Sequence, residues 1–393
     1  MGVISSIGIG KDAFWESLLQ GRSGISPVTA FDTTNHFTHN GGEAKLFKAE
    51  QFIPEERLKF MNRATQMAVA SSKLATEDAT LTPDYLSSLT VGVSHGTTLG
   101  AAQAIESVDS LLISKQEVGK ELLYQMPTQT APAAIAREFK CSGPHFMVST
   151  ACAAGNYAIA YAYDLITLNR ADIMIVGASD GISRIEYTGF NQFSAVAPEK
   201  CQPFDKNRRG MMLAEGAGML VLESMENAVK RKAPIYAEIA GYGLSCDAHH
   251  MTNASVEGIT ECMRKAMREA GITPEDVDYI SAHGTGTIAN DRAECAAIKK
   301  VFGPLYKTIP ISSIKSMLGH TMGAASALEA IVCALALKHD VIPPTINFET
   351  PDPECDIDCV PNEARKHTVN IALNNSYAFG GNNASLVLKK FIS

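Results

Sequence analysis

One cysteine stands where a nucleophile could act. Cys152 follows the apolar, strand-like run His145–Ser149 and opens the Ala-rich stretch Ala153–Thr167. A thiol at a helix N-terminus meets unpaired backbone N–H groups and the positive end of the helix dipole, which favour the thiolate and can hold an oxyanion. Free cysteines are more often buried and inert, so this position alone leaves both interpretations open.

Two histidines and a lysine favour the catalytic interpretation. His283 follows another strand-like run in the sequence His-Gly-Thr-Gly-Thr, and His320 closes the segment Lys315-Ser-Met-Leu-Gly-His. A lone histidine is usually structural, and a lone lysine is usually solvated. Here, however, a cysteine and two histidines occupy strand ends, where an α/β sheet places its site. The set predicts nucleophilic catalysis assisted by imidazole groups.

A glycine pair near the C-terminal end follows an aromatic residue. Gly380-Gly381 comes directly after Phe379, between the strand-like runs Val369–Leu373 and Ser385–Leu388. Such a pair is ordinary in a tight turn. It also fits a mobile loop that carries an aromatic gate and a backbone N–H donor.

Strand-like and helix-like segments alternate along the chain, which is typical of an α/β fold. The predicted strands are Leu89–Val93, His145–Ser149, Ile173–Val176, Met219–Leu222, Tyr279–Ala282, Ile309–Ser312, Val369–Leu373 and Ser385–Leu388. The predicted helices are Arg63–Glu77, Ala153–Thr167, Gly258–Ala270 and Gly323–Leu337.

The two parts of the chain repeat one order of elements. Val-Gly-Val-Ser-His-Gly-Thr-Thr from Val91 and Tyr-Ile-Ser-Ala-His-Gly-Thr-Gly from Tyr279 each close a strand, and a strand leading into a small-residue helix lies downstream of each. We therefore expect two similar α/β halves packed together. The expected division gives an N-terminal half, residues 1–240, with the cysteine, and a C-terminal half, residues 241–393, with both histidines.

Composition excludes several classes of protein. Of the 393 residues, 46% are hydrophobic and 19% are charged, which excludes a disordered chain. The net charge is −8, from 34 Lys and Arg against 42 Asp and Glu, so nucleic-acid binding is not expected. The nine cysteines include no Cys-x-x-Cys pair and predict reduced thiols in the cytoplasm.

The sequence also lacks signals for other sites. The uncharged stretch 141–163 is too polar for a membrane span, and the N-terminus has no signal pattern, so no membrane partner is expected. Cys355 and Cys359 have no second pair of ligands at useful spacing, so no metal is expected. No glycine motif for a nucleotide is present.

Several motifs, in the expected order, resemble those of the β-ketoacyl-acyl carrier protein synthases, the condensing enzymes of the thiolase superfamily. They are Thr150-Ala-Cys-Ala-Ala-Gly155, Gln202-Pro-Phe-Asp-Lys-Asn-Arg208 with Glu215-Gly-Ala-Gly218, His283-Gly-Thr-Gly-Thr287, Lys315 to His320, and Ala378-Phe-Gly-Gly-Asn-Asn383. The resemblance covers nearly the whole chain and implies a thiolase-like fold layered αβαβα. Two catalytic histidines place the chain with the elongating type II synthases.

The resemblance implies a decarboxylative Claisen condensation, in fatty-acid or specialised polyketide or polyene biosynthesis. Cys152 would take the acyl group from a carrier-protein phosphopantetheine thioester. His283 and His320 would bind the thioester carbonyl of malonyl-carrier and stabilise the enolate formed as CO2 leaves. Lys315 would support the site electrostatically, with Glu329 in the shell behind it.

Further roles come from the same resemblance. Backbone N–H groups of Cys152 and Phe379 would form the oxyanion hole, and Thr285 and Thr287 would hydrogen-bond the pantetheine arm. The reaction would require no metal and no dissociable cofactor.

An acyl carrier protein is the expected partner. Carrier proteins are acidic, so docking on this acidic chain needs local basic patches. The two candidate patches are Arg57, Lys59 and Arg63, and Lys206, Arg208 and Arg209. A homodimer is expected, with a heterodimer of related subunits as the alternative.

The sequence departs from the family pattern at several points, one of them Arg208-Arg-Gly-Met211 where the family usually has Arg-Asp-Gly-Phe. The family's usual Gly-Phe-Gly-Gly-Thr-Asn reads Ala-Phe-Gly-Gly-Asn-Asn from Ala378, which leaves the acyl substrate open. The family also begins with a strand before the Met-Gly that opens this chain, so we expect that strand to be missing.

Other functions fit the sequence less well. A chain-length factor, the non-condensing partner subunit, would lack the nucleophile that Cys152 supplies. A thiolase would carry a second cysteine near the C-terminus, and none lies in 374–383. A papain-like hydrolase would not show this ordered set of motifs.

Overall fold

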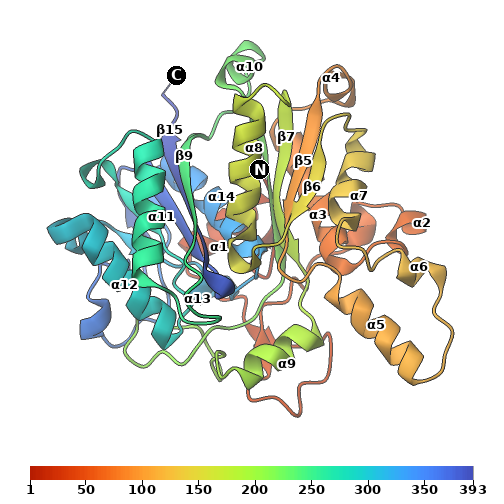
Figure 1. Cartoon of the computed structure of the whole chain (residues 1–393), viewed down its shortest axis with the longest axis horizontal. Helices are drawn as coiled ribbons and strands as arrows, with labels where there is room; N and C mark the ends of the chain where they lie inside the picture. Colours follow the sequence, from red (N-terminus) through yellow and green to blue (C-terminus); the bar gives the residue numbers. More distant parts are fainter. Residues whose placement is uncertain (393) are drawn as a thin grey trace.

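The computed structural model describes residues 1–392, in which two sheets and three layers of helices alternate (Figure 1). The first sheet has the order β2-β1-β8-β7-β5-β6 and the second β11-β10-β14-β15-β9. The first contains β2 (Gly8–Ile9), β1 (Gly2–Ser5), β8 (Gly216–Glu223), β7 (Ile173–Asp180), β5 (Val91–Gly96) and β6 (His145–Val148). The second contains β11 (Ile311–Ser312), β10 (Tyr279–Ser281), β14 (Ile371–Tyr377), β15 (Asn382–Lys390) and β9 (Ala237–Cys246).

The two sheets share one topology, which confirms the expected pair of similar halves. In each, a strand pairs in parallel with a neighbour on both sides: β5 with β6 and β7, and β10 with β11 and β14. An antiparallel strand follows, β8 in one half and β15 in the other, and a further antiparallel strand lies beside it, β1 or β9. The proposed boundary between residues 240 and 241 stays a prediction, and it falls within β9.

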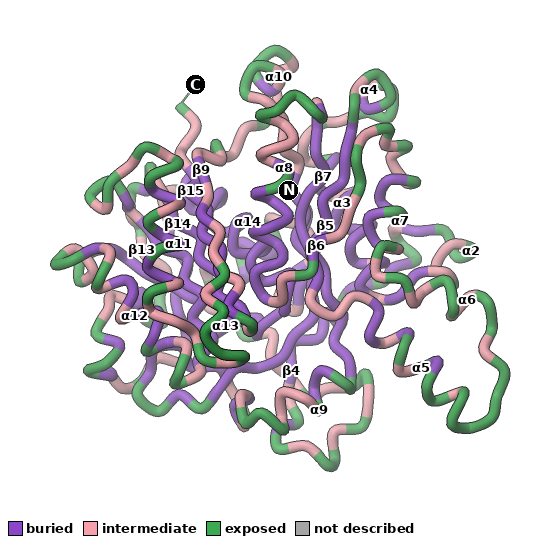
Figure 2. Tube along the Cα trace, in the orientation of Figure 1, coloured by how far each residue is buried: buried purple, intermediate pink, exposed green. Residues whose placement is uncertain are grey.

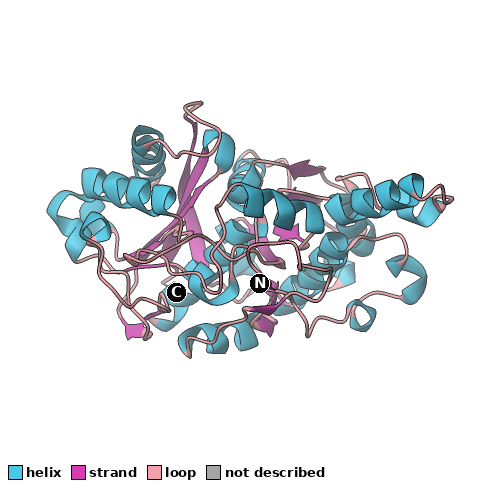
Figure 3. Ribbon diagram, turned by 90° about the horizontal axis from the view of Figure 1, so that it is seen from below, coloured by secondary structure: helices cyan, strands magenta, loops and turns pink. Residues whose placement is uncertain are grey.

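Helices cover the outer face of each sheet and fill the space between the sheets (Figures 1 and 3). Helices α3 (Arg63–Asp78) and α7 (Thr130–Phe139) cover the first sheet, and α11 (Val256–Glu269) and α12 (Ile288–Phe302) lie on the side of the second. Between the sheets lie α8 (Ala154–Thr167) and α14 (Ala324–His339). This order confirms the predicted αβαβα layers.

The remaining elements are short or peripheral. They are α1 (Lys11–Leu19), α2 (Glu55–Leu58), α4 (Pro83–Ser87), α5 (Ala102–Ile113), α6 (Lys120–Leu123), α9 (Arg184–Gln192), α10 (Met225–Lys230), α13 (Lys315–Leu318), and the strand pairs β3 (Ser26–Pro27) with β4 (Asn40–Gly41) and β12 (Val341–Ile342) with β13 (Arg365–Lys366). None of the helices within residues 1–392 has the length and apolar character that crossing a membrane needs.

The central helices join the two halves. Every residue of α14 from Ala324 to Leu337 is buried, and the Ala- and Leu-rich sequence suits a helix enclosed on all sides (Figure 2). A Cβ atom at Gly155 on α8 would lie 2.6 Å from the backbone nitrogen of Ala327 on α14, so glycine is what permits this close packing. The backbone that carries the nucleophile is therefore held directly against the C-terminal half.

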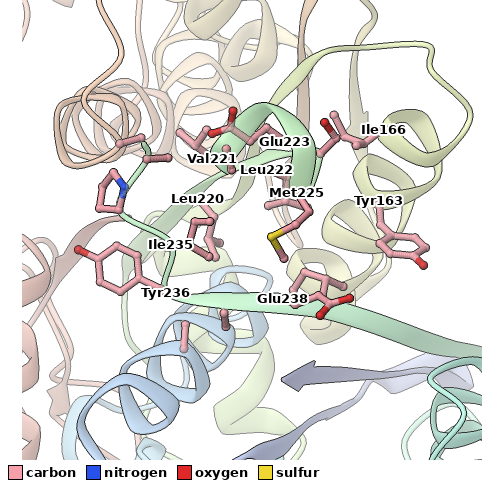
Figure 4. A pocket seen from close by; sticks show the side chains of 18 of the residues that line it. Tyr163, Ile166, Leu220, Val221, Leu222, Glu223, Met225, Ile235, Tyr236 and Glu238 are labelled. Atoms are coloured by element: carbon pink, nitrogen blue, oxygen red, sulfur yellow. The ribbon is translucent and has the colours of Figure 1, made fainter. Parts of the chain in front are cut away.

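The first strand of the chain lies after Met1, so it is not the strand that the family places before Met-Gly, and the expectation about that strand stays a prediction. Residues Gly2–Ser5 form β1, with Val3 and Ile4 fully buried, and Gly2 pairs with Met219 of β8. Beyond Met219, β8 continues to Glu223 along a cavity of about 430 Å³ that Leu220 to Glu223 help to line (Figure 4). A cavity therefore lies along the part of β8 with which β1 does not pair.

Candidate active site

The nucleophile lies on a tight turn between β6 and α8. Cys152 occupies the short 3-10 turn Ala151–Ala153, and Ala151 has a left-handed backbone with φ of 48°. A non-glycine residue in that conformation is strained and is held by its surroundings. The Ser376 hydroxyl, at the end of β14, donates to the Cys152 carbonyl oxygen at 3.0 Å. Strand β14 thus fixes the nucleophile from the opposite half.

The structure brings both predicted histidines to Cys152. The Cys152 sulfur and one ring nitrogen each from His283 and His320 lie within 4.8 Å of one another, and all three residues are buried. The two imidazole rings meet edge to face at a centroid distance of 5.5 Å, and Tyr377 packs against His283 at 6.0 Å. The prediction that strand ends from both halves form one site is therefore consistent with this geometry.

The hydrogen bonds of His320 define its tautomer. Its Nδ1 accepts the backbone N–H of Met322 at 3.1 Å, so the ring proton lies on Nε2. Nε2 is buried and has no hydrogen-bond partner among residues 1–392, and the same holds for Nδ1 of His283. Burial, reinforced by the charge of Lys315, lowers the pKa of both imidazoles well below the usual value, so both rings are neutral near pH 7. His320 therefore offers an unused N–H donor.

Burial also decides the resting form of the nucleophile. It raises the pKa of the Cys152 thiol to about 12, and the Lys315 ammonium opposes this rise. The helix position predicts a thiolate, but desolvation outweighs it, so the resting group is the thiol. Acylation must therefore remove this proton during the reaction.

Lys315 and Glu329 form a buried ion pair beside the site. Both side chains are 1% exposed, and the Lys315 ammonium contacts Oε1 of Glu329. Burial raises the pKa of Glu329, and the lysine charge works in the opposite direction. The remaining oxygen, Oε2, has no partner within hydrogen-bond distance. The pair supplies a fixed cation close to the two histidines, as the sequence predicts.

A small cavity of about 40 Å³ opens onto Cys152 and both histidines. Thr285, Thr287 and Phe379 line it, at positions where the family resemblance puts a pantetheine arm and a gate. The Thr285 and Thr287 hydroxyls lie 2.9 Å apart. These residues lie together as expected, and their roles stay predictions.

Phe379 sits on a turn that only glycine easily completes. Gly380 and Gly381 have φ values of 82° and 83°, in the left-handed region. The Phe379 ring packs against Phe190 of α9 at a centroid distance of 5.8 Å, and the N–H of Gly380 donates to the Met251 carbonyl oxygen at 2.8 Å. Phe379 on this turn thus packs against a helix of the other half.

Two carboxylates of α12 hold the loop of His283, and the sequence motifs do not include them. Glu294 accepts the backbone N–H groups of His283 and Gly284, each at 2.8 Å, and Asp291 accepts those of Phe204 and Gly286 at 2.9 and 3.2 Å. Both carboxylates are fully buried. The only signal in the sequence is their spacing of one helical turn just after the glycine motif.

The expected carrier-docking residues separate into exposed and paired cations. Lys59, Lys206 and Arg209 are exposed. Arg57 pairs with Glu138, Arg63 with the buried Glu215 at 2.7 Å, and Arg208 with Asp352. Arg208 is only 3% exposed, and its guanidinium group pairs with Asp352 inside the fold. This corrects the expectation that Arg208 reaches a partner protein. Docking by the exposed cations stays a prediction.

Comparison with known proteins identifies the family. Residues 1–228 match the β-ketoacyl synthase N-terminal domain and residues 236–349 match the β-ketoacyl synthase C-terminal domain. The chain therefore belongs to the β-ketoacyl synthase family, and it is an enzyme of the acyltransferase class.

Individual relatives cover its full length. It is 38% identical to 3-oxoacyl-[acyl-carrier-protein] synthase 2 of Synechocystis sp., over 100% of this chain and 97% of that protein. It is 39% identical to the protein of the same name from Coxiella burnetii, over 99% of this chain and 97% of that protein. The ishigamide ketosynthase/chain length factor structure matches with a TM-score of 0.96 and 42% identity, over 100% of this chain and 98% of that one.

Proposed function

We propose that this chain condenses an acyl group held on Cys152 with a malonyl group carried by an acyl carrier protein. The observation that supports this most strongly is the meeting of Cys152, His283 and His320 within 4.8 Å in one buried cavity. Elongating condensation needs such a set, because one site must first hold an acyl group and then stabilise an enolate. The relatives named as 3-oxoacyl-carrier-protein synthases support the same reaction.

In the first step the Cys152 sulfur attacks the acyl thioester carbonyl. The carbon–sulfur bond to the carrier breaks, and the carrier leaves as a thiol that takes up the proton lost by Cys152. The backbone N–H groups of Cys152 and Phe379 hold the transient oxyanion. A neutral imidazole within 4.8 Å gives the departing proton a base to pass through.

In the second step malonyl-carrier enters the same cavity. The bond to its carboxylate breaks, CO2 leaves, and the electron pair becomes an enolate on the thioester. Nε2–H of His320 donates to the enolate oxygen, and His283 supplies the second donor. The enolate carbon then attacks the acyl-Cys152 carbonyl, the carbon–sulfur bond breaks, and the departing sulfur takes up a proton from water to restore the thiol. A β-ketoacyl thioester remains on the carrier.

The role of a chain-length factor receives less support. Such a partner subunit would lack the nucleophile, whereas Cys152 is present and lies with both histidines. The solved relatives keep two assemblies open: one structure pairs a ketosynthase with a chain length factor, and another holds a type II polyketide ketosynthase with its acyl-carrier protein. We propose a homodimer in the cytoplasm, with a heterodimer as the alternative, and substrates carried on phosphopantetheine without a separate cofactor.

Intact-mass spectrometry tests the proposal. The protein is incubated with a panel of acyl-carrier thioesters, and the mass increase is mapped to one residue by peptide analysis. We expect acylation on Cys152 and none in Cys152→Ala, with C246A as the matched control because Cys246 is exposed and free. Acylation of another cysteine by the substrates would refute the assignment.

A further inference from the structure

Helix α9 carries a buried carboxyl group that the condensation mechanism does not use. The Glu186 side chain is 4% exposed, and among residues 1–392 neither of its carboxyl oxygens has a hydrogen-bond partner. Its backbone N–H donates to the Ser183 hydroxyl oxygen, which caps the helix at 3.2 Å. A buried polar group without a partner is destabilising, and native proteins seldom keep one without a reason.

The protonation state of Glu186 follows from its neighbour Asp180. Asp180 accepts the Thr97 hydroxyl and the backbone N–H groups of Thr98, Leu99 and Gly323, all within 3.1 Å. Glu186 has no such donors at its carboxyl group. Burial and then the charge of Asp180 raise the pKa of Glu186 well above the usual value. Burial also raises the pKa of Asp180, but its four hydrogen-bond donors oppose that rise, so Glu186 is the one of the two groups that keeps its proton and has an O–H group to donate.

Glu186 lies one helical turn from an aromatic residue that lines the catalytic cavity. Phe190, four residues later and so on the same face of α9, lines the cavity of Cys152 and packs against Phe379. The spacing on α9 thus brings Glu186 close to the aromatic contact that lines the cavity of the nucleophile.

The residue next to Glu186 belongs to an apolar cluster that reaches the catalytic cavity. Tyr187 packs in a cluster with Ile182, Met211 and Met322, and Met211 also lines the catalytic cavity. An acyl chain that extends from Cys152 past the gate would find hydrophobic walls with one hydrogen-bond donor among them. A plain alkyl chain would leave that donor unpaired, whereas an oxygen on the chain would satisfy it.

We propose that Glu186 is a specificity-determining residue that donates a hydrogen bond to an oxygen substituent of the acyl group on Cys152. This inference rests on the proposed function, because the acyl group must first be loaded on that cysteine. It narrows the substrate class to acyl chains with a keto or hydroxyl oxygen and disfavours plain alkanoyl chains of equal length. The principle is that a buried donor selects the ligand that pairs with it.

A competition of matched thioesters tests the inference. Each pair holds an alkanoyl-pantetheine and an acyl-pantetheine of equal length with a keto oxygen at the penultimate carbon, over a ladder of chain lengths. Loading on Cys152 is followed by intact mass. We expect the unmodified protein to prefer the keto member by about tenfold at the lengths that reach Glu186. Glu186→Gln keeps a donor and should keep the preference, whereas E186L should lose it and load alkanoyl chains faster.

A control variant and three outcomes separate the explanations. Gln192→Leu makes a similar polar-to-apolar change on an exposed position of the same helix and should leave the ratio unchanged. No loading of either member would count against the proposed function itself. Loading without any preference in the unmodified protein overturns the role of Glu186, and so does an unchanged ratio in E186L. If E186L does not fold, the ratio in the unmodified protein and in E186Q decides.

Discussion

The two halves place the same short motif on equivalent strands and use it differently. His95 lies on β5 and donates through Nε2 to the Ser179 hydroxyl oxygen at 2.9 Å, and that hydroxyl donates to the Ala64 carbonyl oxygen at 2.8 Å. His283 follows β10 and lines the catalytic cavity instead. A His-Gly-Thr sequence at a strand end therefore does not define a reactive group. What makes the histidine reactive is its neighbouring side chain, which either occupies a ring nitrogen with a hydrogen bond or leaves that nitrogen available.

The connections differ more than the strands. In the N-terminal half the link from β7 to β8 is long, runs through residues 181–215 and includes α9. In the C-terminal half the equivalent link from β14 to β15 is the short turn that carries Phe379. The two links meet at the contact of Phe190 with Phe379. Duplicated halves thus obtain an asymmetric site by lengthening one connection and keeping the other short.

The largest expected effect is on decarboxylation, and it separates the catalytic histidines from His95 of the N-terminal half. His283→Ala and His320→Ala each remove a donor to the enolate, and loss of one such donor typically lowers the rate by about 10²–10³-fold. We expect both variants to release CO2 from malonyl-carrier at that reduced rate while still loading acyl groups on Cys152. His95→Ala is the matched control and should retain its rate per folded molecule. Normal CO2 release by H283A or H320A would contradict the assigned role.

Acid sensitivity should, in contrast, be shared by both histidine environments. Burial lowers the pKa of His95 to about 4 and those of His283 and His320 well below the usual 6.5. The unfolded chain binds protons at higher pH than the folded one. This contribution to stability is therefore complete above pH 6.5 and is lost as pH falls below it, by about 1.4 kcal/mol per pH unit for each histidine.

Urea unfolding over a pH series measures this loss. His95→Gln and H320Q should each reduce the slope of the free energy of unfolding against pH by a similar amount. Only H320Q should also lose decarboxylation. A slope equal to that of the unmodified protein in either variant would show that its histidine does not resist protonation in the folded state.

The gate should give a smaller effect. An aromatic pair is worth about 0.5–1.5 kcal/mol beyond its buried area, so Phe379→Ala should change acyl loading about two- to tenfold and unequally across chain lengths. Phe37→Ala alters an exposed aromatic ring elsewhere and serves as the control. Loading that is unchanged at every chain length would argue against gating.

The smallest effect should come from the exposed docking cations. Reversal of Lys59, Lys206 and Arg209 to glutamate should raise KM for acyl-carrier substrates by a few-fold, since charges at the rim of an interface mostly alter association and its salt dependence. A small acyl-pantetheine should react as before. Lys366→Glu, an exposed charge outside the expected set, is the control. Equal damage to both substrates would indicate a structural defect.

Much of the fold could be predicted because its strands are short apolar runs with helical segments between them. Strand β9 was missed, since only two of its ten residues are fully buried and its pattern is weak. The nucleophile and both histidines were found because strand ends and glycines mark them locally. Glu186 and Glu294 could not be found in this way, because a glutamate within a helix is expected to face solvent unless the fold shows what covers it. For the same reason, the sequence could not predict that Arg208, which stands among other basic residues, is buried.

The hydrogen bonds between the central helices and β14 determine how the enzyme can open. The Asn156 side chain exchanges hydrogen bonds with Asn374, whose amide also donates to the Ser326 carbonyl oxygen at 2.9 Å. These buried amides join α8, α14 and β14 across the boundary of the halves. A slow hinge motion between halves would have to break them, whereas the glycine turn at Phe379 can move on the faster timescale of loops. The buried amides therefore favour motion of the glycine turn over motion between the halves.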